Sequence, residues 1–354
     1  MKNNGLYQED IKSVLNLNCN FFELKKKTIL ITGATGLIGS VLVDMFVFLS
    51  KTYKLDLYLL LISRTAENFS EKFEDTFIQH IKCDVANENL TEKIPLDKKI
   101  DFIFHLASNT HPDDYSKYPI ETILINFNGT KRLLDIASKN LPCRFILASS
   151  VEVYGDDKEK LSGGFKESDF GYLDCNTMRA CYNESKRISE TLCQAYKAEK
   201  DFDVVIARIA RSYGATLKKN DTKALSQFLR CGLNNENIIL KSSGEQYFSY
   251  IYSSDVACAL VFLMLKGKCT EAYNIADKKS NIHLKDLAKL VAKNCNVQVA
   301  FDIPEETEKA GYSRSVRAIL NTEKINTLGW SAKVNIEEGI KRTIKILQDR
   351  NYFF

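Results

Sequence analysis

A glycine-rich turn near the start of the chain constrains its fold more than any other segment. An apolar run at residues 28–31 leads into Thr-Gly-Ala-Thr-Gly-Leu-Ile-Gly at residues 32–39, and an apolar stretch of helical length covers residues 37–49. A strand, a tight turn and a helix in this order leave the N–H groups of a helix N-terminus free to bind phosphate. The segment therefore predicts a dinucleotide-binding loop, and a plain glycine-rich turn is the alternative.

Each glycine of this turn has a separate structural role. Gly33 permits the tight turn after the strand, Gly36 lets the backbone approach a pyrophosphate, and Gly39 allows the following helix to pack closely. The other residues predicted to contact the dinucleotide here are Thr35, Leu37 and Ile38.

The chain then alternates between strand and helix patterns. Apolar runs typical of buried parallel strands lie at residues 57–62, in the segment that ends with 83–85, and at residues 101–107 and 144–150. Helical patterns occupy residues 120–139 and 184–198. This alternation predicts an α/β fold with a Rossmann-type, doubly wound parallel sheet and helices on both faces.

The end of the second predicted strand bears on the choice of cofactor. Ser63 and Arg64 stand where NAD-binding folds place an acidic residue, which accepts hydrogen bonds from the adenosine ribose. An arginine suits a 2′-phosphate instead, so this position favours NADP over NAD; a solvated strand end is the alternative for Arg64. Asp84, at the end of the third strand, is placed to reach the adenine amine.

Tyr182 and Lys186 form the second informative pattern, in the run Tyr-Asn-Glu-Ser-Lys. Their spacing places a phenol and an ammonium on one face of a helix. Beside a nicotinamide, such a pair indicates proton transfer coupled to hydride transfer at a carbinol carbon. Without the other motifs it would be an ordinary exposed helix pair.

A series of motifs along the chain resembles those of one enzyme family. They are the glycine turn, His-Leu-Ala at 105–107, Asn-Phe-Asn-Gly-Thr at 126–130, Ser-Ser-Val-Glu-Val-Tyr-Gly at 149–155, the Tyr182/Lys186 pair, the run at 208–214 and Leu-Gly-Trp at 328–330. Over about residues 27–345 the chain resembles the extended short-chain dehydrogenase/reductases, in the branch of nucleotide-sugar epimerases, dehydratases and decarboxylases.

The resemblance implies roles for the residues of the site. Tyr182 would take the proton from a sugar hydroxyl, normally that on C4, while Lys186 and the positive nicotinamide lower the pKa of its phenol. Lys186 would also bind the nicotinamide ribose, and Ser150 would relay the proton. Further cofactor contacts are implied for Val85, Leu106, Ala107, Ser108 and Asn126, and a substrate contact for Thr110.

Glu152 indicates which reactions of that family this chain is expected to catalyse. The dehydratases and decarboxylases have a glutamate at this place that acts as a base at C5 or as an acid/base, whereas plain epimerases usually lack it. Dehydratases of the glucose type also have an aspartate just before it, and here Val151 cannot donate a proton. The pattern therefore disfavours simple 4,6-dehydration; a solvated residue after a strand is the alternative for Glu152.

Two departures from the family pattern concern anion binding. Arg211 replaces the asparagine of Arg-x-x-Asn-x-Tyr-Gly, and Phe248 replaces an arginine that contacts the β-phosphate. Since an arginine fork suits phosphate or carboxylate, we predict that Arg211 takes over anion binding. Arg179 and Arg317 are further candidates for substrate binding, for which a surface role is equally open.

The composition agrees with an enzyme that acts on a small anion. Among 354 residues, 49 basic and 45 acidic side chains give a net charge of +4 without a basic block, so nothing indicates nucleic-acid binding. Ten scattered cysteines and four histidines, without a Cys-x-x-Cys motif, predict reduced thiols and no bound metal. A polar N-terminus and short apolar runs predict a cytoplasmic protein that does not enter a membrane.

The patterns also divide the chain into parts. These are an N-terminal extension at residues 1–26 with a short helix near 9–15, an NAD(P)-binding domain at 27–205 with about 241–269, and a smaller C-terminal substrate-binding lobe at 206–240 and 270–354. We expect a strand near 249–252 and a helix near 255–265 to return to the first domain. The family resemblance implies a homodimer joined through the helices at 120–139 and 184–198.

Three functions remain open from the sequence. The leading one is a redox-neutral enzyme that oxidises C4 of a nucleotide sugar, acts at C5 or C6 through Glu152, and returns the hydride, which gives decarboxylation, epimerisation or dehydration. The second is a net NADPH-dependent reductase of a nucleotide-linked keto sugar, which Arg64 and Val151 favour. The third is a non-catalytic cofactor-binding protein, which has no use for the complete set of Ser150, Tyr182 and Lys186.

Overall fold

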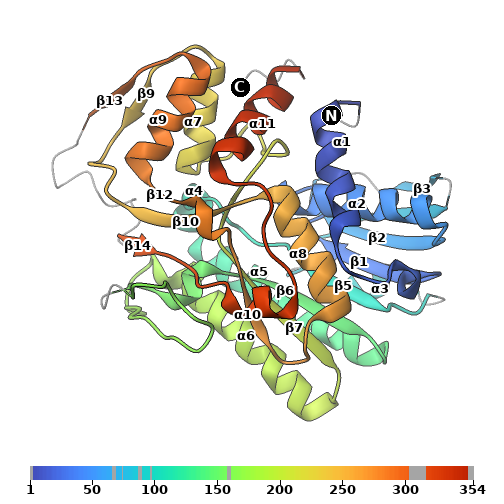
Figure 1. Cartoon of the computed structure of the whole chain (residues 1–354). Coiled ribbons are helices and arrows are strands. Elements are labelled where there is room, and N and C mark those ends of the chain that lie inside the picture. Colours follow the sequence, from blue (N-terminus) through green and yellow to red (C-terminus); the bar gives the residue numbers. More distant parts are fainter. Residues whose placement is uncertain are drawn as a thin grey trace.

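The computed structural model describes residues 3–65, 69–73, 75–86, 90–95, 98–157, 161–302 and 316–349. Within them the central element is an eight-stranded sheet with the spatial order β11-β7-β6-β5-β1-β2-β4-β3 (Figure 1). Its strands are β1 (Thr28–Thr32), β2 (Leu57–Ser63), β3 (Phe69–Phe73), β4 (Thr76–Lys82), β5 (Phe102–His105), β6 (Arg144–Ser150), β7 (Asp203–Ile209) and β11 (Ala272–Ile275). All neighbouring strands pair in parallel except β3, which runs antiparallel to β4 at the edge.

Helices surround this sheet and build the rest of the molecule. They are α1 (Gly5–Lys12), α2 (Leu37–Tyr53), α3 (Leu90–Lys93), α4 (Pro112–Lys117), α5 (Pro119–Lys139), α6 (Ala180–Lys200), α7 (Ala224–Leu233), α8 (Ser253–Lys266), α9 (Leu284–Cys295), α10 (Glu323–Leu328) and α11 (Ile336–Asp349). In the described residues no helix combines the length and the apolarity that crossing a bilayer requires.

The two faces of the large sheet are covered by different helix pairs (Figure 1). α2 and α8 pack together on one face, and α5 and α6 pack together on the other. The side chains of β1 alternate between the two cores, with Ile29 and Ile31 beneath α2 and Leu30 on the side of α5. A strand that is buried on both faces has a continuous apolar sequence. The apolar runs from which these strands were predicted are therefore explained by their burial on both faces. The predicted Rossmann-type α/β fold is confirmed.

A smaller group of strands lies beside the carboxyl ends of the large sheet. Its strands are β8 (Arg211–Tyr213), β10 (Tyr247–Tyr252), β12 (Asn281–His283) and β14 (Arg317–Ala318), and a separate pair is β9 (Ile238–Leu240) with β13 (Val299–Phe301). β10 pairs with the other three strands of the first group. The strand near 249–252 thus lies outside the large sheet, whereas α8 directly after it packs on that sheet. The predicted domain limits stay a prediction.

The N-terminal extension is tied to this smaller sheet by a buried carboxylate. α1 begins at Gly5 and continues as a 3-10 turn through Asn16, so the helix starts earlier than the sequence predicts. Asp10 accepts hydrogen bonds from the Tyr252 hydroxyl at 2.7 Å and from Arg342 at 2.9 Å. Burial raises the pKa of Asp10, and these partners oppose the shift. The extension thus packs against both β10 and α11.

Candidate active site

The glycine turn between β1 and α2 leaves no room for side chains. A Cβ atom added to Gly39 would lie 2.2 Å from the Gly33 carbonyl oxygen, and one added to Gly36 would lie 3.1 Å from the same atom. Gly33 has a φ of 70°, and its Cβ would meet the amide nitrogen of Ala107 at 2.9 Å. The turn is folded onto the first turn of α2 and onto the segment after β5. This backbone cradle at a helix N-terminus fits the pyrophosphate of a dinucleotide.

Three other residues of the turn lie where the loop enters α2. Thr35, Leu37 and Ile38 are half-buried, and the Leu37 carbonyl accepts a hydrogen bond from the Thr216 hydroxyl at 2.6 Å. This bond attaches the start of α2 to the loop that follows β8. The loop of the smaller lobe and the predicted phosphate-binding turn are therefore in direct contact.

The segment after β5 forms the next part of the cradle. Thr32 bonds to His105 Nδ1 at 2.9 Å and accepts from the Ala107 amide at 3.2 Å, which fixes the segment that continues from Leu106. The Ser108 hydroxyl donates to Asn126 at 2.8 Å, and the Asn126 amide donates to the Ser185 hydroxyl at 2.9 Å. These bonds join the segment after β5 to α5 and α6, so Ser108 and Asn126, two residues that the family resemblance places around the cofactor, are in direct contact.

The predicted adenosine end lies after β2 and β4. Ser63 bonds to His80 at 2.9 Å, and Asp84 accepts from the Ala86 amide at 2.8 Å. Arg64 forms an ion pair with Glu121 at 2.9 Å and donates to Asn109 at 3.2 Å. The described geometry thus gives Arg64 a carboxylate partner that the sequence did not suggest. Val85 is buried, and Thr110 is exposed just after Asn109.

Tyr182 is buried at the start of α6, opposite Ser150 at the end of β6. Burial raises the pKa of Tyr182 to about 12; a hydrogen bond with Ser150 opposes this shift, the charge of Glu152 adds to it, and Arg179 opposes it. A lowering of this pKa by a bound nicotinamide together with Lys186 stays a prediction. The Lys186 ammonium is 6.0 Å from the centre of the phenol ring and donates to the Ala148 carbonyl at 2.9 Å.

Lys186 itself is buried beside a carboxylate. Burial lowers the pKa of Lys186 to about 8, and the charge of Glu190 opposes this shift. Glu190 is in turn held by Arg208, through a salt bridge of 2.7 Å, and by the Ser149 hydroxyl at 2.5 Å. The pKa of this ammonium is therefore closer to neutral pH than that of an exposed lysine, which suits a residue that influences a neighbouring proton transfer.

Glu152, Arg211 and Phe248 form one cluster at the sugar end. Arg211 makes a salt bridge of 3.0 Å to Glu152, and its guanidinium carbon lies 3.5 Å from the centre of the Phe248 ring. Asn183 donates to both the backbone carbonyl and the carboxylate of Glu152, at 2.8 and 3.3 Å. Among the described residues, Nη1 of Arg211 is buried and has no hydrogen-bond partner. The two departures from the family pattern therefore contact each other: the arginine stacks on the phenylalanine.

Arg179 and Arg317 are held by different parts of the structure. The guanidinium of Arg179 lies 4.3 Å from the centre of the Tyr115 ring, and that ring lies 5.7 Å from the ring of Tyr182. Arg317 makes a salt bridge of 3.1 Å to Asp157 and donates to the Leu161 carbonyl at 2.6 Å. Arg179 is thus one aromatic ring away from Tyr182, whereas Arg317 anchors the loop between β6 and α6.

Sequence reasoning missed Tyr115, Asn183 and Glu121. Tyr115 lies in the short helix α4, and only its ring contact with Tyr182, with the centroids 5.7 Å apart, reveals its position. Asn183 was visible next to Tyr182, but its contact with Glu152 depends on the turn after β6. Glu121 had no motif, because its partner Arg64 is far away in the sequence.

Comparison with known proteins decides the family. The model of the family described as "NAD dependent epimerase/dehydratase family" matches residues 29–276, which is well over half of the chain. The chain belongs to the NAD dependent epimerase/dehydratase family. The resemblance derived from the motifs is confirmed, and the enzyme class is NAD-dependent.

Relatives within the epimerase/dehydratase family agree with the fold. The chain is 30% identical to UDP-glucuronic acid decarboxylase 1 of Danio rerio, over 91% of this chain and 73% of that protein. It is similar in structure to a UDP-glucose 4-epimerase of Thermotoga maritima with UDP-glucose, with a TM-score of 0.77, 22% identity, and coverage of 92% and 99%. A structure of MoeE5 in complex with UDP-glucuronic acid and NAD gives a TM-score of 0.72, 22% identity, and coverage of 91% and 99%.

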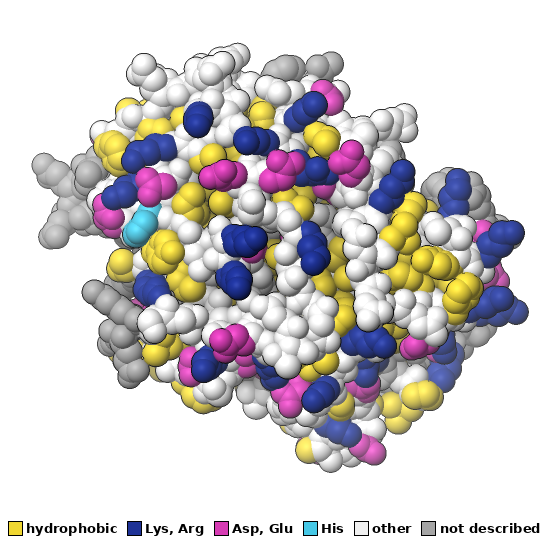
Figure 2. All heavy atoms as spheres, viewed as in Figure 1, with side chains coloured by type: hydrophobic (Ala, Val, Ile, Leu, Met, Phe, Trp, Pro, Cys, Tyr) yellow, Lys and Arg dark blue, Asp and Glu magenta, His cyan; other side chains and the backbone are white. Residues whose placement is uncertain are grey.

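The surface viewed in Figure 2 carries both signs of charge. Lys and Arg side chains are spread over this face and alternate with Asp and Glu, and they do not merge into one basic area in this view.

Proposed function

We propose that this protein is a redox-neutral decarboxylase of a nucleotide-linked uronic acid. The Arg211 guanidinium carries the proposal: it is fixed beside Glu152 and has a buried N–H group without a partner among the described residues. A planar fork in this position suits a carboxylate on the sugar. The similarity to the Danio rerio decarboxylase supports the same reaction.

The proposed chemistry assigns a task to each residue of the site. Tyr182, hydrogen-bonded to Ser150, takes the proton of the C4 hydroxyl once it is a phenolate, and the positive charges of Lys186 and of a bound nicotinamide would favour that form over the neutral phenol that burial favours. A bound nicotinamide supplies a hydride acceptor at the start and a hydride donor at the end, so no net oxidation occurs. The residues that would hold this dinucleotide are those of the glycine cradle, the segment after β5, and Asn126.

Carbon dioxide leaves because a ketone at C4 makes the C6 carboxylate a β-keto acid. The C5–C6 bonding pair moves into the C4–C5 enolate, and C5 then takes up a proton. Arg211 holds the carboxylate until it leaves, and Glu152 is placed to relay the proton to C5. Val151 is buried and has no proton to give to a leaving hydroxyl, which argues against dehydration.

The test is product analysis on the full-length protein. UDP-, CDP-, GDP- and dTDP-linked uronic acids, neutral sugars and keto sugars are incubated with and without NADPH, and mass spectrometry and nicotinamide absorbance are followed. We expect loss of carbon dioxide from a uronic acid without net nicotinamide turnover. An unchanged mass would indicate epimerisation instead, and loss of water would indicate dehydration. Product that forms only with stoichiometric NADPH consumption would replace this proposal with the second candidate, the net reductase that Arg64 favours.

For the cofactor we propose that the site accepts NADP as well as NAD, with Arg64 as the partner of the 2′-phosphate. Arg64 follows β2, where dinucleotide-binding folds contact the adenosine ribose, and its side chain is half-exposed. Comparison of the two dissociation constants tests this assignment. A dissociation constant for NADP that exceeds that for NAD by more than about tenfold would contradict it.

We also propose a homodimer that forms through α5 and α6. Apolar side chains on these helices are exposed, namely Ile120, Ile123 and Leu124 on α5 and Ile188 on α6. Light scattering coupled to size exclusion would show a monomer if this is wrong.

A cytoplasmic location is proposed because all ten cysteines are free thiols, as expected in a reducing compartment.

A further inference from the structure

Arg64 links segments that follow two strands of the large sheet that are not neighbours. It follows β2, while its partners Asn109 and Glu121 lie after β5 and in the first turn of α5. In the sheet β1 separates β2 from β5. The Arg64 side chain therefore joins the end of β2 to the segment after β5 and to the start of α5, and β1 lies between these two strands in the sheet.

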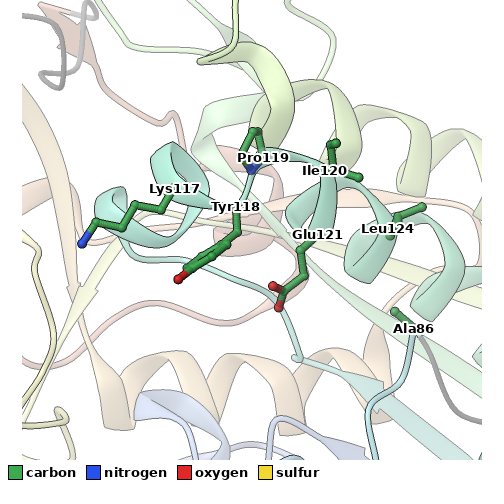
Figure 3. A pocket seen from close by; sticks show the side chains of 7 residues that line it. All are labelled: Ala86, Lys117, Tyr118, Pro119, Ile120, Glu121 and Leu124. Carbon is green, nitrogen blue, oxygen red and sulfur yellow. The ribbon is translucent and has the colours of Figure 1, made fainter.

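These contacts join two segments beside the predicted adenosine half of the cofactor site. The glycine turn follows β1, and β2 and β5 lie on either side of the point where the strand order reverses, which is where such sheets bind their ligands. A pocket of about 410 Å³ is lined by Ala86, Tyr118, Glu121 and Leu124, among others (Figure 3). Ala86 follows Asp84 and Val85 directly, so Glu121 lies at the edge of the expected adenine site.

The arrangement of Glu121 suits a contact inside this crevice. Figure 3 shows its carboxylate on the same side of the start of α5 as the ring of Tyr118, while Ile120 points to the other side. Asn109 is buried, and its amide donates to Thr122 at 3.5 Å, so its oxygen faces Arg64. Arg64 is thus held by one fixed neutral acceptor and one charged, half-exposed acceptor.

We propose that Glu121 sets the balance between NAD and NADP by competing with the 2′-phosphate for Arg64. The proposal deepens the cofactor assignment made above and does not depend on the sugar reaction. The side chains of Arg64 and Glu121 are 50% and 39% exposed, and an ion pair this exposed is weak enough to exchange partners. NAD, which has no 2′-phosphate, would leave the Arg64–Glu121 pair intact. NADP must draw Arg64 away and leaves Glu121 unpaired near the phosphate.

The competition makes Arg64 a poor indicator of cofactor choice when it is taken alone. An arginine after β2 predicts NADP only if its guanidinium is free to meet the phosphate. Here a carboxylate from α5 already occupies it. In effect the acid that is missing at the end of β2 is supplied by α5, and it acts through Arg64.

The test is calorimetric titration of the purified full-length protein, freed of nucleotide, with NAD⁺ and with NADP⁺. We expect Glu121→Gln to tighten NADP⁺ binding by about tenfold and to leave NAD⁺ within about twofold. Arg64→Ala should weaken NADP⁺ by at least about tenfold, with a smaller effect on NAD⁺. In the double variant the gain from Glu121→Gln should vanish, because it acts through Arg64.

A matched control separates this competition from a general charge effect. Asp135→Asn removes the same charge from α5 at a half-exposed ion pair with Lys131, roughly 20 Å from Glu121 along the helix. The proposal is overturned if Asp135→Asn tightens NADP⁺ as much as Glu121→Gln does. Equal shifts for both dinucleotides, or a gain that persists in the Arg64→Ala background, would also overturn it. Because no sugar is present, failure of the decarboxylase proposal would leave this measurement unaffected.

Discussion

The two ends of the candidate site are shaped by different parts of the chain, by backbone at one end and by side chains at the other. At the dinucleotide end, backbone sets the shape: Gly39 and Gly33 are in contact, and the helix start supplies the N–H groups. At the sugar end, side chains set it: Glu152 and Arg211 pair, and Arg211 stacks on Phe248. A site formed by backbone tolerates few substitutions, and it is therefore marked by a recognisable sequence motif. At a site formed by side chains, two contacting residues can be substituted together. The following variants test this difference between the two ends of the site.

The largest effect is expected from the side-chain end, for Tyr182→Phe. Loss of the hydroxyl removes the group that takes the C4 proton, and turnover should fall by about 10³-fold. Dinucleotide binding should change little, because the glycine cradle is intact. Tyr115→Phe is the matched control, since it removes a hydroxyl from the neighbouring buried ring. Steady-state kinetics and nucleotide titration check both; equal losses of turnover in the two variants would remove Tyr182 from its assigned role.

Lys186→Met should stabilise the protein at neutral pH while it impairs catalysis. The pKa of the buried ammonium is lowered from its ordinary 10.5 to about 8, so burying the charged form costs about 3 kcal/mol. Between these two values the unfolded lysine holds its proton more often than the folded one, so wild-type stability rises with pH. The difference in the free energy of unfolding between the variant and the wild type should therefore shrink as pH increases from about 8 to 10.5.

Urea denaturation of both proteins across this pH range measures the difference. Lys289→Met, at a side chain that is 60% exposed, serves as the control and should give a difference that is flat with pH. A flat difference for Lys186→Met as well would mean that the ammonium is solvated in the folded protein.

At the backbone end, Gly39→Ala should weaken dinucleotide binding by roughly 10- to 100-fold. The added Cβ would lie 2.2 Å from the Gly33 carbonyl oxygen, so backbone must shift, at about 1–3 kcal/mol. Gly5→Ala is the control, because a Cβ there meets nothing within 4 Å. Calorimetry with NAD⁺ and thermal unfolding measure both variants. Unchanged binding in Gly39→Ala would show that the cradle is not rigid.

The sequence predicted the fold well because both of its main signals are local. Continuous apolar runs at β1, β2 and β6 mark strands buried on both faces, and the glycine turn marks the start of α2. The sheet that β10 joins could not be predicted because pairing is not local: its apolar sequence suits either sheet, and its neighbours β8 and β14 decide. The same limit applies to the antiparallel edge strand β3.

The candidate site was predictable only where roles follow from motif position. Ser150, Tyr182 and Lys186 could be named in advance, but the protonation behaviour of Tyr182 could not, because it depends on burial. Pairings across the crevice were also hidden. Arg64 was interpreted without Glu121, and Arg211 and Phe248 were interpreted as separate departures although they stack.

That stacking leads to the most informative exchange, which restores the family pattern at both positions. Arg211→Asn alone removes a charged donor and should raise the substrate KM by about tenfold. Phe248→Arg alone places a second guanidinium beside the first and should also raise KM. The double variant should recover most of the loss, because one arginine again faces the anion from β10 instead of β8. Phe301→Arg, at an exposed phenylalanine of β13, controls for added positive charge.

The exchange separates two explanations of the stacked pair. If the two positions share one anion-binding task, the effects of the single variants on KM are non-additive and kcat changes little. If Arg211 instead serves only to orient Glu152, the double variant stays as impaired as Arg211→Asn, and the loss lies in kcat. The second result would assign the sugar carboxylate to another cation and would make Arg211 a positioning residue. Side-chain sites of this kind are thus resolved by paired exchange, which a backbone cradle does not allow.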